Sequence, residues 1–196
     1  ARVGRSTADT IADIGPPTAI LYTRFAGVRP DEAAAIWARV RQARPDAQVL
    51  VVGRGVGGEE RALTAAPGIT VVGWVEPEEL PTVFARAQIA LAPWDDRATN
   101  RSRHRANVLA LMAAGAPIVA YAVGELPFTL GEAGCLAPPG DRAAFAQEVL
   151  SLLADPARRR RLAAVGRARV AEHFTWERLV HVALAAYERA LAVTAP

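Results

Sequence analysis

Short apolar runs alternate with amphipathic stretches along most of the chain. This alternation is typical of βαβ units, which build a parallel sheet. Because the runs are continuous and lack the every-second-residue polarity of a half-exposed strand, we expect each strand to be covered on both faces. The expected strands are residues 19–23, 48–52, 69–72, 89–92 and 117–121, with a weaker one at 135–137.

The amphipathic stretches between these runs predict helices, and right-handed crossovers would place the helices on both faces of the sheet. Pro30, followed by Asp31 and Glu32, is a helix start signal, because negative charge is favoured near the positive end of the helix dipole. Gly115 follows an apolar stretch and suits the left-handed residue that ends a helix. The expected helices are residues 30–43, 59–65, 78–87 and 107–114.

Beyond Asp141 the pattern becomes wholly helical. We expect helices at residues 142–153, 156–172 and 176–193, with Thr175 as the N-cap of the last. The sequence therefore predicts one Rossmann-like α/β domain at residues 17–196. We expect it to contain a parallel sheet of about six strands, helices on both faces and a C-terminal helical tail. Residues 1–16 are predicted to be a linker.

The composition suits a packed domain, since 52% of the 196 residues are apolar and 22% are charged. The single cysteine, Cys135, cannot form an internal disulfide. No segment reaches the roughly 18 uninterrupted apolar residues of a membrane span. No group of cysteines, histidines or acidic residues has metal-ligand spacing. We therefore expect no metal and no cofactor. We expect a cytoplasmic protein, and any peripheral contact with a membrane would come through a domain outside this sequence.

The formal charge of +3 comes entirely from arginine, because the sequence contains no lysine. The forked guanidinium group suits phosphate binding, although most of these arginines are expected on a solvated surface. Residues 158–161, for example, are four consecutive arginines that we expect on the exposed face of a helix. Aromatic residues are not interleaved with the basic ones, so nucleic acid is not an expected partner.

The first candidate site is a glycine-rich loop at residues 53–58, which fits the pattern G-x-G-x-x-G through Gly53, Gly55 and Gly58. Glycines in such a loop let backbone amides approach a pyrophosphate. A nicotinamide-dependent oxidoreductase is one interpretation, but the loop follows the second expected strand instead of the first. A phosphate-binding loop or a simple turn is the preferred interpretation.

The second candidate is the stretch at residues 100–105, where three arginines and His104 precede the helix expected from Asn107. Free amides, the helix dipole and guanidinium groups would converge there on an anion. The alternative is an exposed polar loop, but the stretch follows the carboxyl end of a strand, where α/β sheets bind ligands. The preceding Asp95 and Asp96 are expected to cap a helix or pair with Arg97 instead of binding metal.

One distinctive segment is residues 111–124, LMAAGAPIVAYAVG. Further segments, in fixed order and spacing, are residues 20–25, 49–55, 70–75, 138–141 and 173–176. Together they resemble the C-terminal domain of the group 1, family 4-like retaining glycosyltransferases, which have the two-domain GT-B fold, and the resemblance covers residues 18–190. In this family the C-terminal domain binds the nucleotide sugar and the N-terminal domain supplies the acceptor site.

The resemblance implies a role for each matching position. Arg24 and Arg29 lie where cations reach the donor diphosphate, and the loop with Gly53 and Gly55 lies beside the nucleotide. Trp74 and Val75 lie where the base is bounded by backbone. The positions that hold the sugar and diphosphate are Arg101, Ser102, Arg103, His104 and Asn107.

The sequence departs from the family pattern at its acidic positions. Two glutamates eight positions apart are replaced by Ser102 and Ala110, and the lysine that some relatives keep is replaced by Asn107. A later acidic position holds Phe128, with Glu125 as a nearby substitute on the sugar side. Without its carboxylate at Ala110, a ribose diol would lose a charge-assisted hydrogen bond of about 1.5–3 kcal/mol.

Two hypotheses follow. The first is the donor-binding half of a hexosyltransferase, which transfers a sugar from a nucleoside diphosphate sugar to an unknown acceptor and needs an N-terminal acceptor domain or partner chain. The second is a degenerate, non-catalytic GT-B-like binding or scaffold module, which the missing acidic residues favour.

Overall fold

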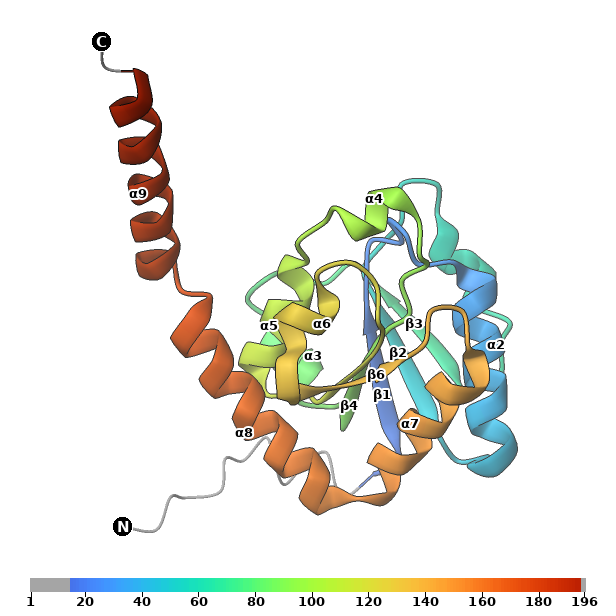
Figure 1. Ribbon diagram of the computed structural model, residues 1–196. Coiled ribbons are helices and arrows are strands. Elements are labelled where there is room, and N and C mark those ends of the chain that lie inside the picture. The colour runs from blue at the N-terminus through green and yellow to red at the C-terminus, as the bar shows by residue number, and fades with distance from the viewer. Residues whose placement is uncertain (1–14, 195–196) are drawn as a thin grey trace.

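The computed structural model describes residues 15–194, so nearly all of the predicted linker at residues 1–16 lies outside the described residues (Figure 1). Its centre is a six-stranded sheet with the order β3-β2-β1-β4-β5-β6, and every neighbouring pair is parallel. This is the strand order of a Rossmann fold, as the sequence predicted. The strands are β1 (Thr18–Tyr22), β2 (Gln48–Val52), β3 (Ile69–Gly73), β4 (Ile89–Ala92), β5 (Ile118–Tyr121) and β6 (Gly134–Ala137).

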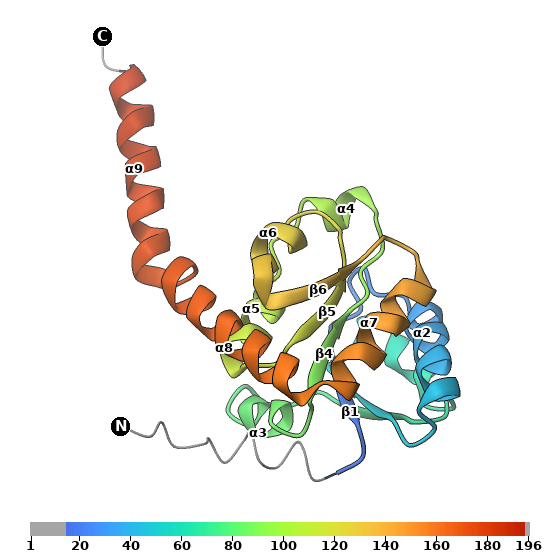
Figure 2. The same ribbon diagram turned by 60° about the horizontal axis from the view of Figure 1, so that its bottom comes forward.

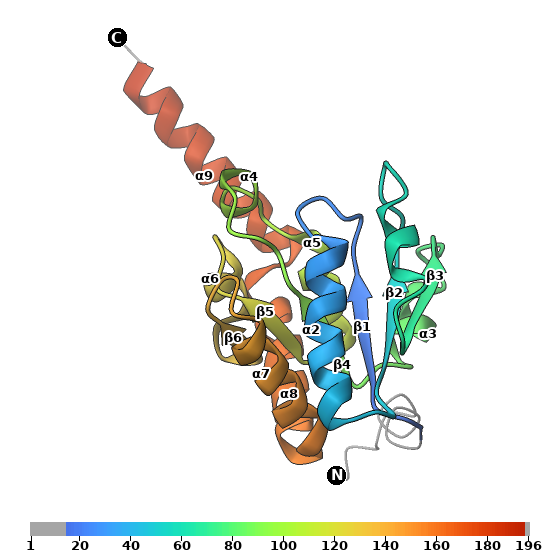
Figure 3. The ribbon, with the colours of Figure 1, turned by 90° about the vertical axis from the view of Figure 1, so that its right-hand side faces the viewer.

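Helices cover both faces of the sheet (Figures 1 and 3). On one face α2 (Pro30–Ala43) packs against α7 (Arg142–Ala154), beside the 3₁₀ helix η1 (Glu59–Leu63). On the other face α5 (Ala106–Ala114) packs against α8 (Pro156–His173) and α3 (Leu80–Phe84). The connections from β1 and from β4 therefore leave toward opposite faces of the sheet, which opens a crevice between these two strands at their carboxyl ends.

The last helix, α9 (Trp176–Thr194), extends away from the sheet and its covering helices in all three views (Figures 1, 2 and 3). Thr175 precedes it, and its hydroxyl accepts a 3.4 Å hydrogen bond from the backbone of Arg178, so the predicted N-cap is confirmed. Apolar side chains on α9 are exposed, among them Trp176 at 80% and Tyr187 at 70%. No helix within residues 15–194 is long and apolar enough to cross a bilayer.

Most predicted elements are confirmed within one or two residues, but four details differ. The expected helix at 78–87 shortens to α3, and the one at 59–65 is η1. Three short helices, α4 (Ala98–Arg101), α6 (Leu126–Leu130) and the 3₁₀ helix η2 (Gly131–Ala133), were not predicted, because about one turn of helix leaves no periodic pattern. The prediction that every strand is covered on both faces is wrong for β3, an edge strand whose Thr70 and Val72 are exposed.

The prediction of an exposed arginine run at residues 158–161 is also wrong in part. Arg159 is buried, and its Nη1 donates hydrogen bonds to the carbonyls of Leu152 at 2.9 Å and Leu153 at 2.8 Å. These carbonyls belong to the last turn of α7, where helical carbonyls run short of backbone donors, and that of Leu152 also accepts a 3.3 Å hydrogen bond from the backbone N–H of Asp155. Arg159 therefore joins α8 to the end of α7, a role that a sequence pattern of four identical charges does not reveal.

Candidate functional site

A pocket of about 260 Å³ lies at the carboxyl ends of β1 and β4, where the sheet connections diverge. We call it the switch-point pocket. Its volume is close to the lower end of the range for small-molecule sites, about 300–1,000 Å³. Three arginines and a histidine line it, and none of its described lining residues is acidic. The lining residues are Tyr22, Thr23, Arg24, Ala26, Trp94, Arg103, His104, Arg105, Ala106 and Asn107.

The loop after β1 presents Arg24 to this pocket. Thr23 is buried and continues the sheet pairing, since its backbone N–H donates to the carbonyl of Val52 at 2.9 Å. Its hydroxyl accepts a 2.9 Å hydrogen bond from the backbone of Phe25, whose φ of 58° lies in the left-handed region. Such a conformation is costly for a large side chain and often marks a functional site. The side chain of Phe25 is buried, which leaves Arg24 exposed at the tip of the turn.

The N-terminus of α5 forms the opposite wall of the switch-point pocket. Asn107 lies in its first turn and donates a 2.9 Å hydrogen bond from its side-chain amide to the carbonyl of Tyr22, so the helix start is fixed to the end of β1. The N-cap residue is Arg105, and its side chain makes no capping hydrogen bond. Backbone N–H groups in the first turn of a helix lack intrahelical acceptors and favour an anion.

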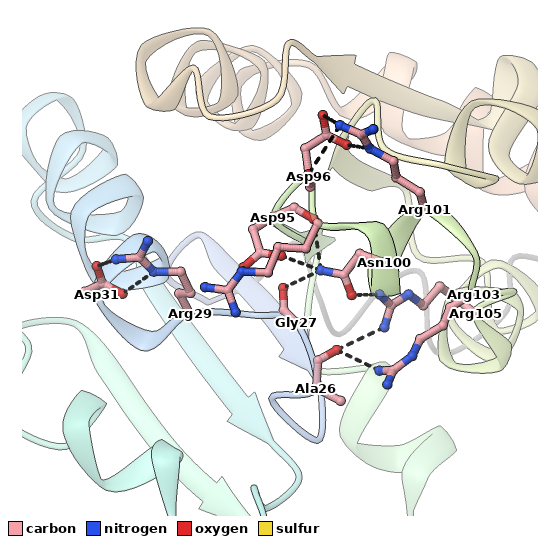
Figure 4. A network of polar contacts seen from close by, with 11 residues as sticks. Ala26, Gly27, Arg29, Asp31, Asp95, Asp96, Asn100, Arg101, Arg103 and Arg105 are labelled. Carbon is pink, nitrogen blue, oxygen red and sulfur yellow. Dashed lines mark hydrogen bonds and ion pairs between the residues drawn. The ribbon is translucent and has the colours of Figure 1, made fainter.

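A buried side-chain amide, that of Asn100, holds residues 101–105, which we call the arginine loop, in place (Figure 4). Asn100 is 2% exposed and donates from its Nδ2 to the carbonyl of Gly27 at 3.2 Å and to the Asp95 carboxylate at 2.6 Å. Its Oδ1 accepts a hydrogen bond from Arg105. Gly27 has a φ of 97°, and a Cβ at this position would collide with the Asn100 side chain, so this close approach requires glycine.

Arg105 is the most constrained cation of the pocket. Its guanidinium carbon lies 4.7 Å from the centre of the Trp94 ring, and its Nη1 donates to the carbonyl of Ala26 at 3.1 Å. Burial, followed by the neighbouring charge of Arg103, lowers the pKa of Arg105 to about 10. The group is still a cation at pH 7, and it adds a fixed positive charge to the floor of the pocket.

Comparison with known proteins identifies the family of this fold. The sequence profile described as "Glycosyl transferases group 1" matches residues 28–155, which is more than half of the chain. The chain belongs to the group 1 glycosyl transferases. This membership agrees with the predicted resemblance and disfavours the nicotinamide-dependent oxidoreductase, which was suggested by the glycine-rich loop alone.

Relatives and solved structures agree with this assignment. D-inositol 3-phosphate glycosyltransferase from Segniliparus rotundus is 30% identical over 175 residues, which are 83% of this chain and 37% of the relative. 2-Deoxystreptamine glucosyltransferase from Streptomyces kanamyceticus is 33% identical over 161 residues, 79% of this chain and 40% of the relative. The chain thus spans about two fifths of the length of these curated relatives. Sucrose-phosphate synthase from Thermosynechococcus elongatus superposes on 95% of this chain and 49% of its own, at a TM-score of 0.71 and 28% identity.

The structure brings four of the predicted group 1 glycosyltransferase positions together in the switch-point pocket. Arg24, Arg103, His104 and Asn107 all line it, from two loops that are about 80 residues apart in the sequence. The convergence follows from the pairing of β1 with β4, since the carboxyl ends of parallel neighbours lie at the same edge.

Two predicted phosphate ligands lie outside this pocket. Arg29 is exposed and pairs with Asp31 in the first turn of α2 (Figure 4). Arg101 donates to the Asp96 carboxylate at 2.7 and 2.8 Å. The predicted pairing of the acidic doublet with Arg97 is confirmed for Asp95, at 3.1 Å, while Asp96 pairs with Arg101 instead.

The glycine-rich loop, with Gly53 and Gly55, does not line the switch-point pocket, and residues 54–58 of it line a separate hollow. Its amides are bound by the chain itself. The N–H of Gly55 donates to the Glu60 carboxylate and that of Gly57 to Glu59, each at 2.9 Å. The hydrogen bond from the backbone N–H of Gly55 lowers the pKa of Glu60, so that its carboxylate stays ionised. Gly53 lies against the backbone of Thr23 and connects the loop to the end of β1.

The remaining predicted positions do not line the pocket. Trp74 is 54% exposed and donates from its indole N–H to Glu76 at 3.0 Å, while Val75 is half-buried. Ser102 and Ala110 are exposed, before α5 and one turn into it. Glu125 is the exposed N-cap of α6.

Four residues that line the pocket were not predicted: Tyr22, Thr23, Ala26 and Trp94. Trp94 lies two residues after β4, as Arg24 lies two residues after β1. An aromatic residue near the carboxyl end of a strand was therefore a usable signal. Asn100 belonged to the predicted stretch at residues 100–105, but its role in holding the loop depends on burial and contacts that the sequence does not show.

Proposed function

We propose that this chain is the donor-binding half of a glycosyltransferase and holds a nucleoside diphosphate sugar with its diphosphate in the switch-point pocket. The observation that carries the proposal is the convergence of Arg24, Arg103 and the N-terminus of α5 on one pocket at the divergence of the sheet connections. Family membership makes a sugar nucleotide the expected anion.

The positive charge of this pocket suits the bond-breaking step of a sugar transferase. When the bond between the anomeric carbon and the diphosphate oxygen breaks, negative charge develops on that oxygen. Guanidinium groups and helix amides that are already in place stabilise this charge without reorganisation. Arg105 adds to the same field from the pocket floor, because hydrogen bonds to Asn100 and Ala26 hold it there.

The other parts of the donor are assigned by position in the family. We propose that the backbone at Trp74 and Val75 bounds the base and that the ribose lies over Ala110. Ser102, His104 and Glu125 would then face the transferred sugar. Arg29 and Arg101 contribute at longer range, since their guanidinium groups are already paired with Asp31 and Asp96.

We propose that the main part of the acceptor site comes from an N-terminal domain or partner chain outside this sequence. The chain spans 37% of the Segniliparus relative, which leaves room in such a protein for a second domain. A C-terminal domain of a group 1 glycosyl transferase from Francisella tularensis has the same fold, at a TM-score of 0.64 and 18% identity, over 94% of that chain.

Calorimetric titration with UDP, GDP, ADP and NAD tests the proposal. We expect one of the three nucleoside diphosphates to bind, and Arg24→Gln to weaken it about tenfold, as expected for the loss of one charge-assisted hydrogen bond. Arg39→Gln, an exposed change in α2, is the matched control and should bind as the unaltered protein does. Because arginines provide the countercharge, EDTA should leave the affinity unchanged. Preferential binding of NAD, or equal affinity in both variants, would contradict the proposal.

A non-catalytic scaffold is the second candidate, favoured by one feature of the site. The glycine loop amides are occupied by Glu59 and Glu60, and the Asn107 amide by Tyr22, so groups that could hold a ligand already have internal partners. If no nucleotide binds at concentrations up to several millimolar, the scaffold is the better description.

A further inference from the structure

A second pocket, of about 570 Å³, lies where α6, α8 and the start of α9 meet. We call it the α6–α9 pocket. Its walls come from the arginine loop through His104, from α6 through Phe128, from α8 through Arg169 and from α9 through Arg178. Among its described lining residues, His104 and Phe128 stand at positions that the family resemblance assigns to the donor, whereas the proposed diphosphate ligands Arg24 and Arg103 do not line it. A ligand in this pocket would therefore be held by groups other than those proposed to bind the diphosphate.

The aromatic part of this pocket is held in a fixed geometry. Arg169 donates from its Nε to the carbonyl of Thr129 at 2.9 Å and from a second nitrogen to the carbonyl of Phe128. Its guanidinium carbon lies 5.7 Å from the Phe128 ring and 5.8 Å from the Phe174 ring. A cation placed between two rings orders both of them. Phe128 nevertheless remains 66% exposed, an unusual position for a phenyl group that its surroundings hold in place.

Positive charge surrounds these rings. Four of the lining residues, His104, Arg169, His173 and Arg178, are basic, and among the described lining residues none is acidic. One carboxylate, that of Glu172, lies 3.8 Å from His173 on the side of α8. Arg169 is occupied by two carbonyls, so Arg178, which is exposed, is the guanidinium group best placed to meet an anion.

His104 connects this pocket to the switch-point pocket, because it lines both. Its imidazole also packs against Phe174, with 5.8 Å between the ring centres. A ligand in the α6–α9 pocket would therefore lie beside the cations proposed to hold the diphosphate. In a glycosyl transfer, the molecule that lies beside the transferred sugar is the acceptor.

We propose that the α6–α9 pocket is an acceptor subsite and that the acceptor is a sugar carrying an anionic group, a phosphate or a carboxylate. The acceptor role rests on the proposed donor-binding function. The apolar C–H face of a sugar ring packs on the exposed Phe128 ring, as flat apolar groups do on aromatic surfaces. The anionic group pairs with Arg178, which offers several donors in one plane.

Titration of the full chain with glucose 6-phosphate, glucose and inorganic phosphate tests both halves of this ligand. We expect glucose 6-phosphate to bind about tenfold more tightly than either of the other two compounds. Phe128→Ala and Arg178→Gln should each weaken it about tenfold, because each removes one of the two contacts. Arg160→Gln, an exposed arginine of α8 outside the pocket, is the matched control and should bind normally. Circular dichroism checks that each variant is folded.

The same chemistry, a phosphate on a polyhydroxylated ring, occurs in free sugar phosphates and in the phosphoinositol headgroup of a phospholipid. Flotation with vesicles that contain phosphatidylinositol separates these sources. Flotation that Arg178→Gln abolishes indicates the lipid source, and binding of glucose 6-phosphate without flotation indicates the free compound. Either result, with the variant effects above, supports the subsite.

Four outcomes would overturn the inference. Equal binding of glucose 6-phosphate by the unaltered chain and by both pocket variants would place the ligand elsewhere. Equal affinity for glucose 6-phosphate and inorganic phosphate would remove the sugar from the proposal. No binding of glucose 6-phosphate alongside normal nucleotide binding would refute the subsite and leave the donor function standing. Binding of glucose 6-phosphate with no nucleotide bound would instead refute the donor function, and the acceptor role with it.

Discussion

The guanidinium group of Arg105 lies over the ring of Trp94, with 4.7 Å between its central carbon and the ring centre. The two residues come from different segments, the start of α5 and the end of β4, and both face the switch-point pocket. Asn100 accepts a hydrogen bond from the same guanidinium and also binds the loop after β1. One cation thus connects three segments at the site, so its contribution to folding can be measured separately from its contribution to binding.

Arg105→Lys should lower the free energy of unfolding by about 1–2 kcal/mol. A lysine ammonium cannot stack on Trp94 and reach both Ala26 and Asn100 from one position. Arg103→Lys is the matched control, because Arg103 is exposed and makes only a 3.4 Å contact with the Ala26 carbonyl. We expect a change below about 0.5 kcal/mol for this surface position. Urea denaturation of both variants measures their free energies of unfolding. Equal values for the two variants would show that the stacked geometry of Arg105 does not contribute to stability.

Gly53 and Gly73 provide a comparison between backbone strain and steric collision. Both have φ in the left-handed region, 111° and 82°. A Cβ at Gly73 meets nothing within 4 Å, whereas a Cβ at Gly53 would collide with the carbonyl oxygen of Thr23. Gly73→Ala should therefore cost about 1–2 kcal/mol from strain alone, and Gly53→Ala should cost more, because the end of β1 must move.

Because Thr23 borders Arg24, Gly53→Ala should also weaken nucleotide binding, and it should do so more than Gly73→Ala, whose added Cβ meets no neighbour within 4 Å. Urea denaturation and calorimetry of the two variants measure the two effects. If Gly73→Ala were the more destabilising change, the close contact between Gly53 and Thr23 would not be the reason that this loop requires glycine.

Glu32 makes stability depend on pH. It is buried in α2, accepts a 2.7 Å hydrogen bond from the Tyr121 hydroxyl and pairs with Arg142 at 2.7 Å. Burial raises the pKa of Glu32, but the hydrogen bonds from Arg142 and Tyr121 outweigh burial, and the pKa is lowered overall. The stabilisation is therefore fully present above the pKa of the unfolded chain and is lost as the pH falls through the lower pKa of the folded state.

Glu32→Gln should remove this part of the acid sensitivity, so the stability difference between the two proteins should shrink as the pH falls below 4. Tyr121→Phe should cost about 1–2 kcal/mol at pH 7, because it removes one hydrogen bond to a buried carboxylate. Urea denaturation from pH 3 to pH 7 measures both effects. A difference between Glu32→Gln and the unaltered protein that stays constant over this range would contradict the assignment.

The sequence was sufficient for the strands and for the family, and it was less informative about the site. Continuous apolar runs identify buried strands directly, so β2 and β4 were predicted with their bounds as observed. The role of a polar side chain depends on its partner in space. Arg29 and Arg101 stand at positions that the resemblance assigns to phosphate binding, but acidic residues two and five positions away pair with them. Asn100 lies in the predicted stretch at residues 100–105, but its structural role depends on its burial and its contacts across the fold.

Restoring the missing carboxylate with Ala110→Glu tests whether the domain descends from a working transferase. Ala110 is exposed on α5, one turn beyond the helix start that lines the switch-point pocket, so a glutamate fits there without displacing the core. Its carboxylate could accept hydrogen bonds from both ribose hydroxyls. We expect nucleotide affinity to rise by about 1–2 kcal/mol, or roughly fivefold to thirtyfold, which is less than a full charge-assisted pair because the carboxylate also loses hydration.

The nearby arginines determine how much of this gain is realised. Arg101 is already paired with Asp96, and Arg105 is held by Asn100, so Arg103 is the cation most able to pair with the new carboxylate and offset the gain. Ala113→Glu is the matched control, because it places the same charge at another exposed position of the same helix. Calorimetry with UDP, GDP and ADP should show tighter binding for Ala110→Glu alone. Equal gains in both variants would indicate a general charge effect, and tighter binding by the unaltered protein than by Ala110→Glu would show that the ribose does not lie over Ala110.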